Sequence, residues 1–102
     1  MISAIVYTSN SGYTAEYARL LGRATGLPVN DLRQVHTPQP DEEVIFLGWL
    51  FAGNIVGYKA AAKKYALRCV CGVGMGPPTP EMAPGLREKM GVPASVPVFY
   101  LQ

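Results

Sequence analysis

The residues best suited to chemistry in this 102-residue chain form one short polar segment near its start. The segment combines hydroxyl groups, an amide and a glycine: Thr8, Ser9, Asn10, Ser11, Gly12, Tyr13 and Thr14. At the start of a helix such a segment can cradle an anion, because free backbone N–H groups and the helix dipole favour negative charge. It therefore predicts a phosphate site that needs no lysine. Helix capping and turn formation are the alternative role of the same residue types.

Two later segments offer aromatic side chains or a flexible backbone. They comprise Trp49, Leu50, Phe51, Ala52 and Gly53, and then Gly74, Met75 and Gly76. Each segment follows an apolar run, and in an open α/β sheet the loops after the strands are where ligands bind. These residues are therefore candidates for a ligand site, although a tryptophan at a strand end can also simply pack in the core.

Hydrophobic patterning divides the chain into alternating strands and helices. Continuous apolar runs predict strands at residues 2–7, 28–32, 44–50, 67–73 and 96–101. Helical spacing predicts helices at residues 13–24, from a cap at Asn54 to Tyr65, and from a cap at Thr79 to Met90, the last irregular or split at Pro84 and Gly85. The first helix is expected to bury an apolar face of Tyr13, Tyr17, Leu20, Leu21 and Ala24.

This alternation predicts one α/β domain over residues 1–102, with a mostly parallel sheet and helices on both faces. In such a sheet a ligand binds outside the carboxyl ends of the strands, where the strand order reverses. The segments 8–14, 49–53 and 74–76 each follow a predicted strand. We therefore expect them to meet at one edge of the sheet.

The segment Ser9-Asn10-Ser11-Gly12-Tyr13-Thr14, preceded by Thr8, resembles the phosphate loop of the flavodoxin family, Thr/Ser-x-Thr/Ser-Gly-x-Thr. Gly48-Trp49-Leu50-Phe51 is similar to the Gly-Trp or Ser-Trp pair of short flavodoxin-like proteins, and the order of nearly all elements agrees. The resemblance implies a doubly wound five-stranded sheet with strand order 2-1-3-4-5. It also implies non-covalently bound FMN, with its phosphate at residues 8–14 and its ring between residues 49–53 and 74–76.

The chain departs from that family in three respects, the first of which is a predicted second helix too short to be a full crossover helix. It carries a net charge of +2, whereas electron-carrier flavodoxins are usually strongly acidic, and it ends at Gln102 after the predicted fifth strand. The family normally adds a final helix there, which covers one face beside the first strand, so apolar surface of the sheet is expected to be exposed. This implies a truncated or proteolysed chain, a second copy of the chain as a homodimer, or a partner protein that covers the face.

Three functions follow from the resemblance and its limits. The leading one is an FMN-binding redox protein that transfers electrons between a partner reductase and an acceptor. The first alternative is an FMN-dependent reductase, or a reductase subunit, acting on a quinone, a tetrapyrrole or a similar flat apolar substrate. The second is a non-redox interaction domain that has lost FMN. No residue stands out as a catalytic acid or base, and His36 is expected on the solvated surface.

Composition narrows the remaining classes. The basic residues are scattered rather than grouped, so nucleic acid is not an expected partner. No apolar run reaches the roughly 18 to 20 residues that span a bilayer, and with no signal-peptide pattern the expected location is the cytoplasm.

Cys69 and Cys71 lie on one face of a predicted strand and are expected to be small buried apolar residues. Two cysteines do not make a four-ligand zinc site, so no metal is expected.

Overall fold

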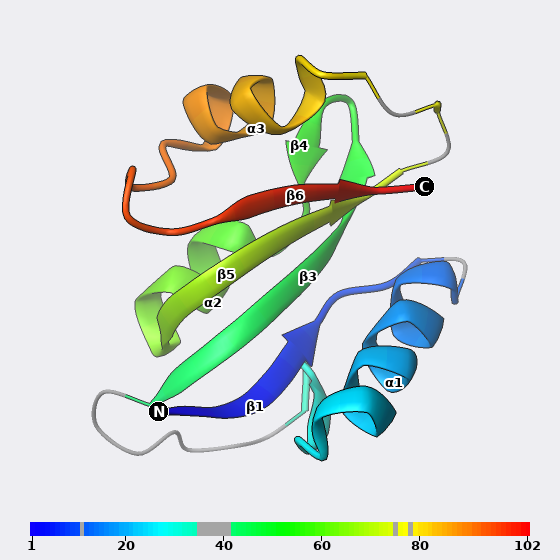
Figure 1. Ribbon diagram of the computed structural model, residues 1–102, viewed down its shortest axis with the longest axis vertical. Coiled ribbons are helices and arrows are strands. Elements are labelled where there is room, and N and C mark those ends of the chain that lie inside the picture. The colour runs from blue at the N-terminus through cyan, green and yellow to red at the C-terminus, as the bar shows by residue number, and fades with distance from the viewer. Residues whose placement is uncertain (11, 35–41, 75, 78) are drawn as a thin grey trace.

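A computed structural model describes residues 1–10, 12–34, 42–74, 76–77 and 79–102 (Figure 1). Its elements lie within two residues of most of the predicted ones. In chain order they are β1 (Ile2–Tyr7), α1 (Tyr13–Thr25), β2 (Val29–Asp31), β3 (Glu43–Phe51), β4 (Asn54–Ile55), α2 (Tyr58–Lys64), β5 (Ala66–Val73), α3 (Met82–Met90) and β6 (Val98–Leu101). His36 lies outside the described residues.

Five strands form a parallel sheet in the order β2-β1-β3-β5-β6. Counted along the five parallel strands, this is the predicted order 2-1-3-4-5, so the flavodoxin-like α/β fold class is confirmed. The order reverses between β1 and β3, which pair in parallel with Ile5 opposite Ile45. This is the position at which open α/β sheets bind ligands.

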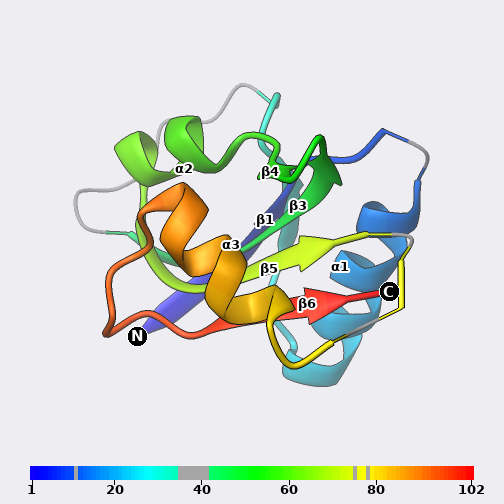
Figure 2. The same ribbon diagram turned by 90° about the horizontal axis from the view of Figure 1, so that it is seen from above.

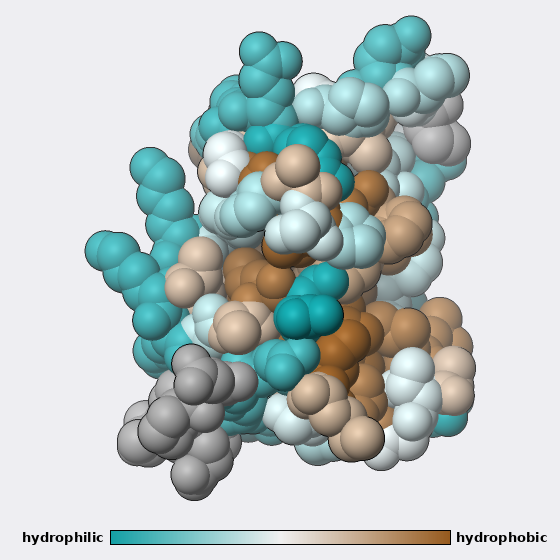
Figure 3. Space-filling model, turned by 60° about the vertical axis from the view of Figure 1, so that its left-hand side comes forward, coloured by the Kyte–Doolittle hydropathy of each residue, from teal (hydrophilic) through white to brown (hydrophobic). Residues whose placement is uncertain are grey.

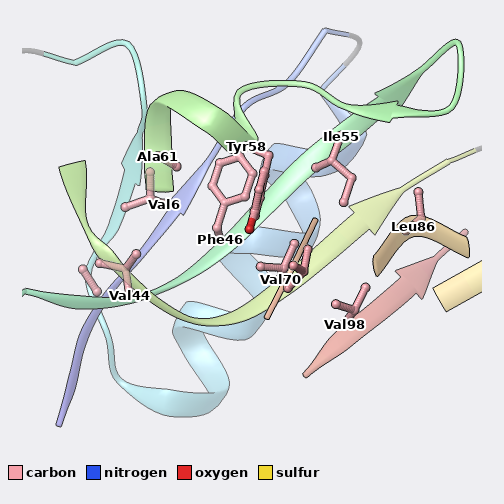
Figure 4. Close-up of a cluster of buried hydrophobic side chains, with 11 residues drawn as sticks. Val6, Val44, Phe46, Ile55, Tyr58, Ala61, Val70, Leu86 and Val98 are labelled. Carbon is pink, nitrogen blue, oxygen red and sulfur yellow. The ribbon is translucent and has the colours of Figure 1, made fainter. Parts of the chain in front are cut away.

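Helices cover the two faces of the sheet unequally (Figure 2). α2 and α3 pack on one face, where Tyr58, Ala61 and Leu86 join the side chains of Phe46 and its neighbours in a buried cluster (Figure 4). α1 packs on the other face through Ala18, against Ile5 and Leu47. Phe46 and Ile5 have no exposed surface, so the core lies along the central strands.

The predicted helix start at Asn54 is wrong. Asn54 and Ile55 form β4, which pairs antiparallel with the end of β3 through a two-residue turn at Ala52 and Gly53. Both turn residues have positive φ, 51° and 79°, the geometry that favours a tight hairpin. The hairpin folds Ile55 directly over Gly48, where an added Cβ would lie 2.5 Å from Ile55 Cγ2. α2 therefore begins only at Tyr58.

The third helix also differs from its prediction. The backbone N–H of Met82 donates to the carbonyl of Thr79, so the intervening Pro80 and Glu81 form a turn and α3 starts at Met82. The predicted irregularity at Pro84 and Gly85 is absent, since α3 continues through both to Met90. Pro84 occupies the first turn of the helix, where a residue's own N–H would have no helical partner.

The face that α1 buries agrees only in part with the predicted one. Tyr17 and Leu21 are half-buried against the core, but Tyr13 and Leu20 are each 56% exposed. The buried residues of the helix are Thr14, Ala15, Ala18 and Gly22. The cause is the close approach of the helix to β2. A Cβ on Gly22 would lie 2.5 Å from Val29 Cγ2, so only small residues fit against the sheet. The large apolar side chains consequently lie along the flanks of the helix.

Apolar side chains also reach the surface elsewhere. Figure 3 shows hydrophobic residues gathered in a band across one face of the molecule, between hydrophilic side chains. Within the described ranges, no helix has the length and apolar composition required to cross a membrane.

Candidate functional site

The carboxyl edge of the sheet holds a cavity of about 420 Å³. All three predicted segments contribute to it: the turn between β1 and α1 with the start of α1, the end of β3, and the residue after β5. Its described lining consists of Asn10, Tyr13, Thr14, Trp49, Leu50, Val73, Gly74 and Gln102. Six of these eight residues belong to the set predicted from the sequence. The exceptions are Val73 and Gln102.

The turn into α1 is built around a glycine. Gly12 adopts a left-handed conformation with φ 94°, and its N–H donates to Ser9 Oγ at 3.0 Å. Gly12 is the residue that precedes the first helical turn, and it has no side chain to accept the amides there. The start of α1 at Tyr13 thus leaves room for a negatively charged group.

The hydroxyl groups of this segment have different surroundings. Thr8 Oγ1 donates to the carbonyl of Val56 at 2.7 Å, and the Thr8 N–H donates to Leu47 O at 2.9 Å. Thr8 therefore anchors the chain that leads into α2. Thr14 is 2% exposed and lines the cavity, while Asn10 is exposed at its rim. Ser11 lies outside the described residues.

The end of β3 supplies the aromatic part of the site. Trp49 is half-buried and lines the cavity together with Leu50. The ring of Phe51 lies beside that of Trp49, with centroids 5.6 Å apart and planes tilted by 60°. Phe51 is 64% exposed and is not among the residues that line the cavity. Trp49 is thus placed between the cavity and a solvent-exposed phenyl ring.

The predicted residues Ala52 and Gly53 lie at the tip of the β3–β4 hairpin. Both are exposed, and neither belongs to the cavity lining. The Lys89 ammonium group on α3 donates to the carbonyl of Ala52 at 3.1 Å. This contact holds the hairpin tip to α3 rather than to the cavity.

The segment after β5 contributes through Gly74, whose N–H donates to Leu101 O at 2.9 Å. Gly76 is exposed, and its carbonyl accepts a hydrogen bond from the hydroxyl of Tyr100. Met75 lies outside the described residues. Val73 and Gln102 were not predicted to line the site. Both lie at the carboxyl end of a strand, since Val73 is the last residue of β5 and Gln102 follows β6, and that position is the signal that could have found them.

The described lining contains no Asp, Glu, Lys or Arg. Outside the lining, Asp31 at the end of β2 pairs with Arg33, and a hydrogen bond from the Arg33 guanidinium lowers the pKa of Asp31. Among the described residues, no group of three His, Cys, Asp or Glu side chains could hold a metal ion. The cavity can therefore orient a ligand by hydrogen bonds and apolar contact, without an ionised acid or base from the described lining.

The fold and the site define a class: a parallel α/β sheet of flavodoxin-like topology with a polar turn and aromatic residues at its carboxyl edge. A scan against protein-family models and searches of curated proteins and solved structures found no match to this chain.

Proposed function

We propose that this chain is a member of the flavodoxin family that binds FMN non-covalently and transfers electrons between a reductase and an acceptor. The observation that carries the proposal is the meeting of the Gly12 turn, Trp49 and Gly74 around one cavity at the strand-order reversal. Each of the three flavodoxin-like segments supplies at least one residue of the cavity lining.

The cavity suits the chemistry of the ligand. Its volume of about 420 Å³ falls within the roughly 300 to 1,000 Å³ that small-molecule sites occupy. The polar groups of Asn10 and Thr14 lie on the α1 side, and the apolar groups of Trp49 and Leu50 lie on the β3 side. This division fits a ligand with a phosphate at one end and a flat ring at the other.

Bound FMN supplies the one- or two-electron chemistry, and the protein supplies the environment. The amides at the start of α1 would bind the phosphate, and Gly12 keeps that approach free of a Cβ. Trp49 would exclude water from one side of the ring. Apolar contact of this kind disfavours a negatively charged reduced ring and so lowers its reduction potential.

The uncharged lining also bears on the partner. Carriers that dock by charge need a complementary partner, and the described lining of this cavity contains no acidic residue. We therefore propose a redox partner whose docking face is not strongly basic. Electron transfer to such a partner is expected to depend weakly on salt.

One observation favours the alternative of an FMN-dependent reductase. Trp49 lines the cavity, and the ring of the largely exposed Phe51 lies next to it outside the lining. Such a pair offers a surface on which a quinone, a tetrapyrrole or another flat apolar substrate can stack. Turnover of a soluble quinone by the reduced holoprotein would distinguish this reductase from a carrier that reacts only with a protein.

The first experiment is a titration of the purified, folded chain with FMN, followed by flavin absorption and fluorescence. We expect one FMN per chain. Trp49→Ala should shift the flavin spectrum and weaken binding by about tenfold, the effect of losing about 1.4 kcal/mol of contact. Phe51→Ala is the matched control because Phe51 lies outside the lining, and its titration should differ little from that of the unaltered chain.

The phosphate end is tested by Gly12→Val. A Cβ at Gly12 meets no protein atom within 4 Å, but the residue has φ 94° and the new side chain would project beside the start of α1. Gly26→Val is the matched control, since Gly26 ends the same helix with φ 77° and equally open space. Gly12→Val should abolish FMN binding, and Gly26→Val should cost only stability.

Failure of FMN to bind the folded, unaltered chain would overturn the redox proposal. The non-redox interaction domain would then be the better account of the fold. Equal FMN affinity of the Gly12→Val and Gly26→Val variants would instead place the phosphate away from the start of α1.

A further inference from the structure

The face of the sheet that α1 covers only in part contains an open apolar groove. It is about 440 Å³ in volume and lies between α1 and the strands β3, β5 and β6. The groove shares no lining residue with the candidate FMN cavity. Two of its lining residues, Cys69 and Cys71 on β5, carry free thiol groups, which can ligate a soft metal ion.

Both thiols point to the same side of β5. Cys69 is paired in register with Ile45 on β3, and Cys71 with Leu47 on β3 and Phe99 on β6. Alternate residues of a strand share a face, so the two sulfur atoms lie side by side among apolar neighbours. Cys69 is half-buried and free, and Cys71 is buried and free. The thiol of Cys69 is therefore the one through which the pair meets solvent.

The spacing of the two cysteines disfavours a disulfide but suits a bridging ion. Residues two apart on a strand are about 6.6 Å apart along it, whereas a disulfide brings its Cβ atoms to about 3.8 Å. An ion in linear coordination between two thiolates holds the sulfur atoms on the order of 4 to 5 Å apart. Two side chains that lean toward each other from the same face of β5 can reach that separation without bending the strand.

We propose that Cys69 and Cys71 form a two-thiolate site that binds one thiophilic metal ion, namely Cu(I). Soft thiolates select Cu(I), and two ligands suit an ion that accepts linear coordination. Zinc would require two further ligands, which the described residues of the groove do not supply. Binding replaces both thiol protons: Cu⁺ and two RSH groups give a bis-thiolate complex of charge −1 and two released protons.

The burial of the two thiols sets the order in which they bind. Cys69 is half-buried and Cys71 is buried, so the ion reaches the thiol of Cys69 first and forms the first metal–sulfur bond at the solvent-accessible position. The metal then displaces the proton of Cys71, since a bound cation favours the thiolate.

The test is an anaerobic titration of the reduced full-length chain with Cu(I), in competition with the chromophoric chelator bicinchoninate. We expect one Cu(I) per monomer, ultraviolet thiolate-to-copper charge-transfer absorption, and at least tenfold weaker binding by Cys69→Ala and by Cys71→Ala. Phe99→Ala is the matched control, because it alters the same groove without removing sulfur. Its affinity should stay within a few fold of that of the unaltered chain.

Circular dichroism of each variant confirms folding, and Cys71→Val replaces Cys71→Ala if the latter unfolds. Equal retention of Cu(I) by the unaltered chain and by Cys69→Ala would overturn the proposal, as would one Cu(I) shared by two chains on size exclusion. This inference does not rest on the proposed FMN site. Titration of the cysteine variants with FMN separates the two, because they should bind FMN like the unaltered chain.

Discussion

The two faces of the sheet differ in how completely they are covered. On one face, α2 and α3 bury Phe46, Val44 and Val70 until none retains exposed surface. On the other face, α1 lies over Ile5 and Leu47, but Phe99 on β6 stays 52% exposed. The difference follows from helix number, since one helix covers about two strands of a five-stranded sheet. The same strands therefore contribute a closed core on one side and an open groove on the other.

Removal of one phenylalanine from each face should give the largest contrast. Phe46→Ala leaves a cavity in the closed core and should lower the free energy of unfolding by about 3–5 kcal/mol. Phe99→Ala removes a side chain that is already half in water, so its cost should be about 1 kcal/mol or less. Urea unfolding followed by circular dichroism measures both. Similar losses would show that the groove is covered in solution, for example by a second copy of the chain.

Two helical glycines sharpen the comparison by the sign of their effects. Gly22→Ala should destabilise the protein by about 1–3 kcal/mol, because the new Cβ would lie 2.5 Å from Val29 Cγ2 and push α1 off the sheet. Gly85→Ala in α3 should stabilise it by about 0.5–1 kcal/mol, since its Cβ meets nothing within 4 Å and alanine favours a helix. Thermal unfolding of the two variants is the measurement. A stabilised Gly22→Ala variant would contradict the close packing of α1.

The strands of the sheet could be read from the sequence because long apolar runs such as residues 44–50 are typical of buried strands, and their order followed from the resemblance to the flavodoxin family. The buried face of α1 could be read only in part. Periodicity marks Leu20 and Tyr13 as core residues, but the helix approaches β2 so closely that Ala18 and Gly22 occupy the contact. That distance depends on the packing of two elements and leaves no signal in either one alone.

The site shows the same limit. The polar segment around Gly12 and the aromatic Trp49 could be assigned to one cavity, because parallel strands place their following residues at one edge. The sequence also predicts Ala52 and Gly53 to be part of this site, because they directly follow Trp49, Leu50 and Phe51. The structure turns them away as the tip of a hairpin, since Gly48 lets Ile55 fold back over β3. A close approach between two backbone segments is again what the sequence pattern does not reveal.

The smallest effect concerns the thiols at the floor of the open face. Because a hydrogen bond from Cys71 lowers the pKa of Cys69, Cys71→Ala should raise that pKa and move the pH midpoint of Cys69 alkylation upward. At neutral pH a smaller fraction of Cys69 is then thiolate, so the variant should react more slowly with iodoacetamide. The slightly wider groove left by the removed side chain acts in the opposite direction but is the smaller effect. The rate is followed by mass spectrometry, and Cys69→Ala provides the control because its remaining thiol is buried. If Cys69 reacts at the same rate and midpoint without Cys71, the two thiols do not interact. The open face would then hold two independent cysteines, in contrast with the coupled pair that the groove geometry brings together.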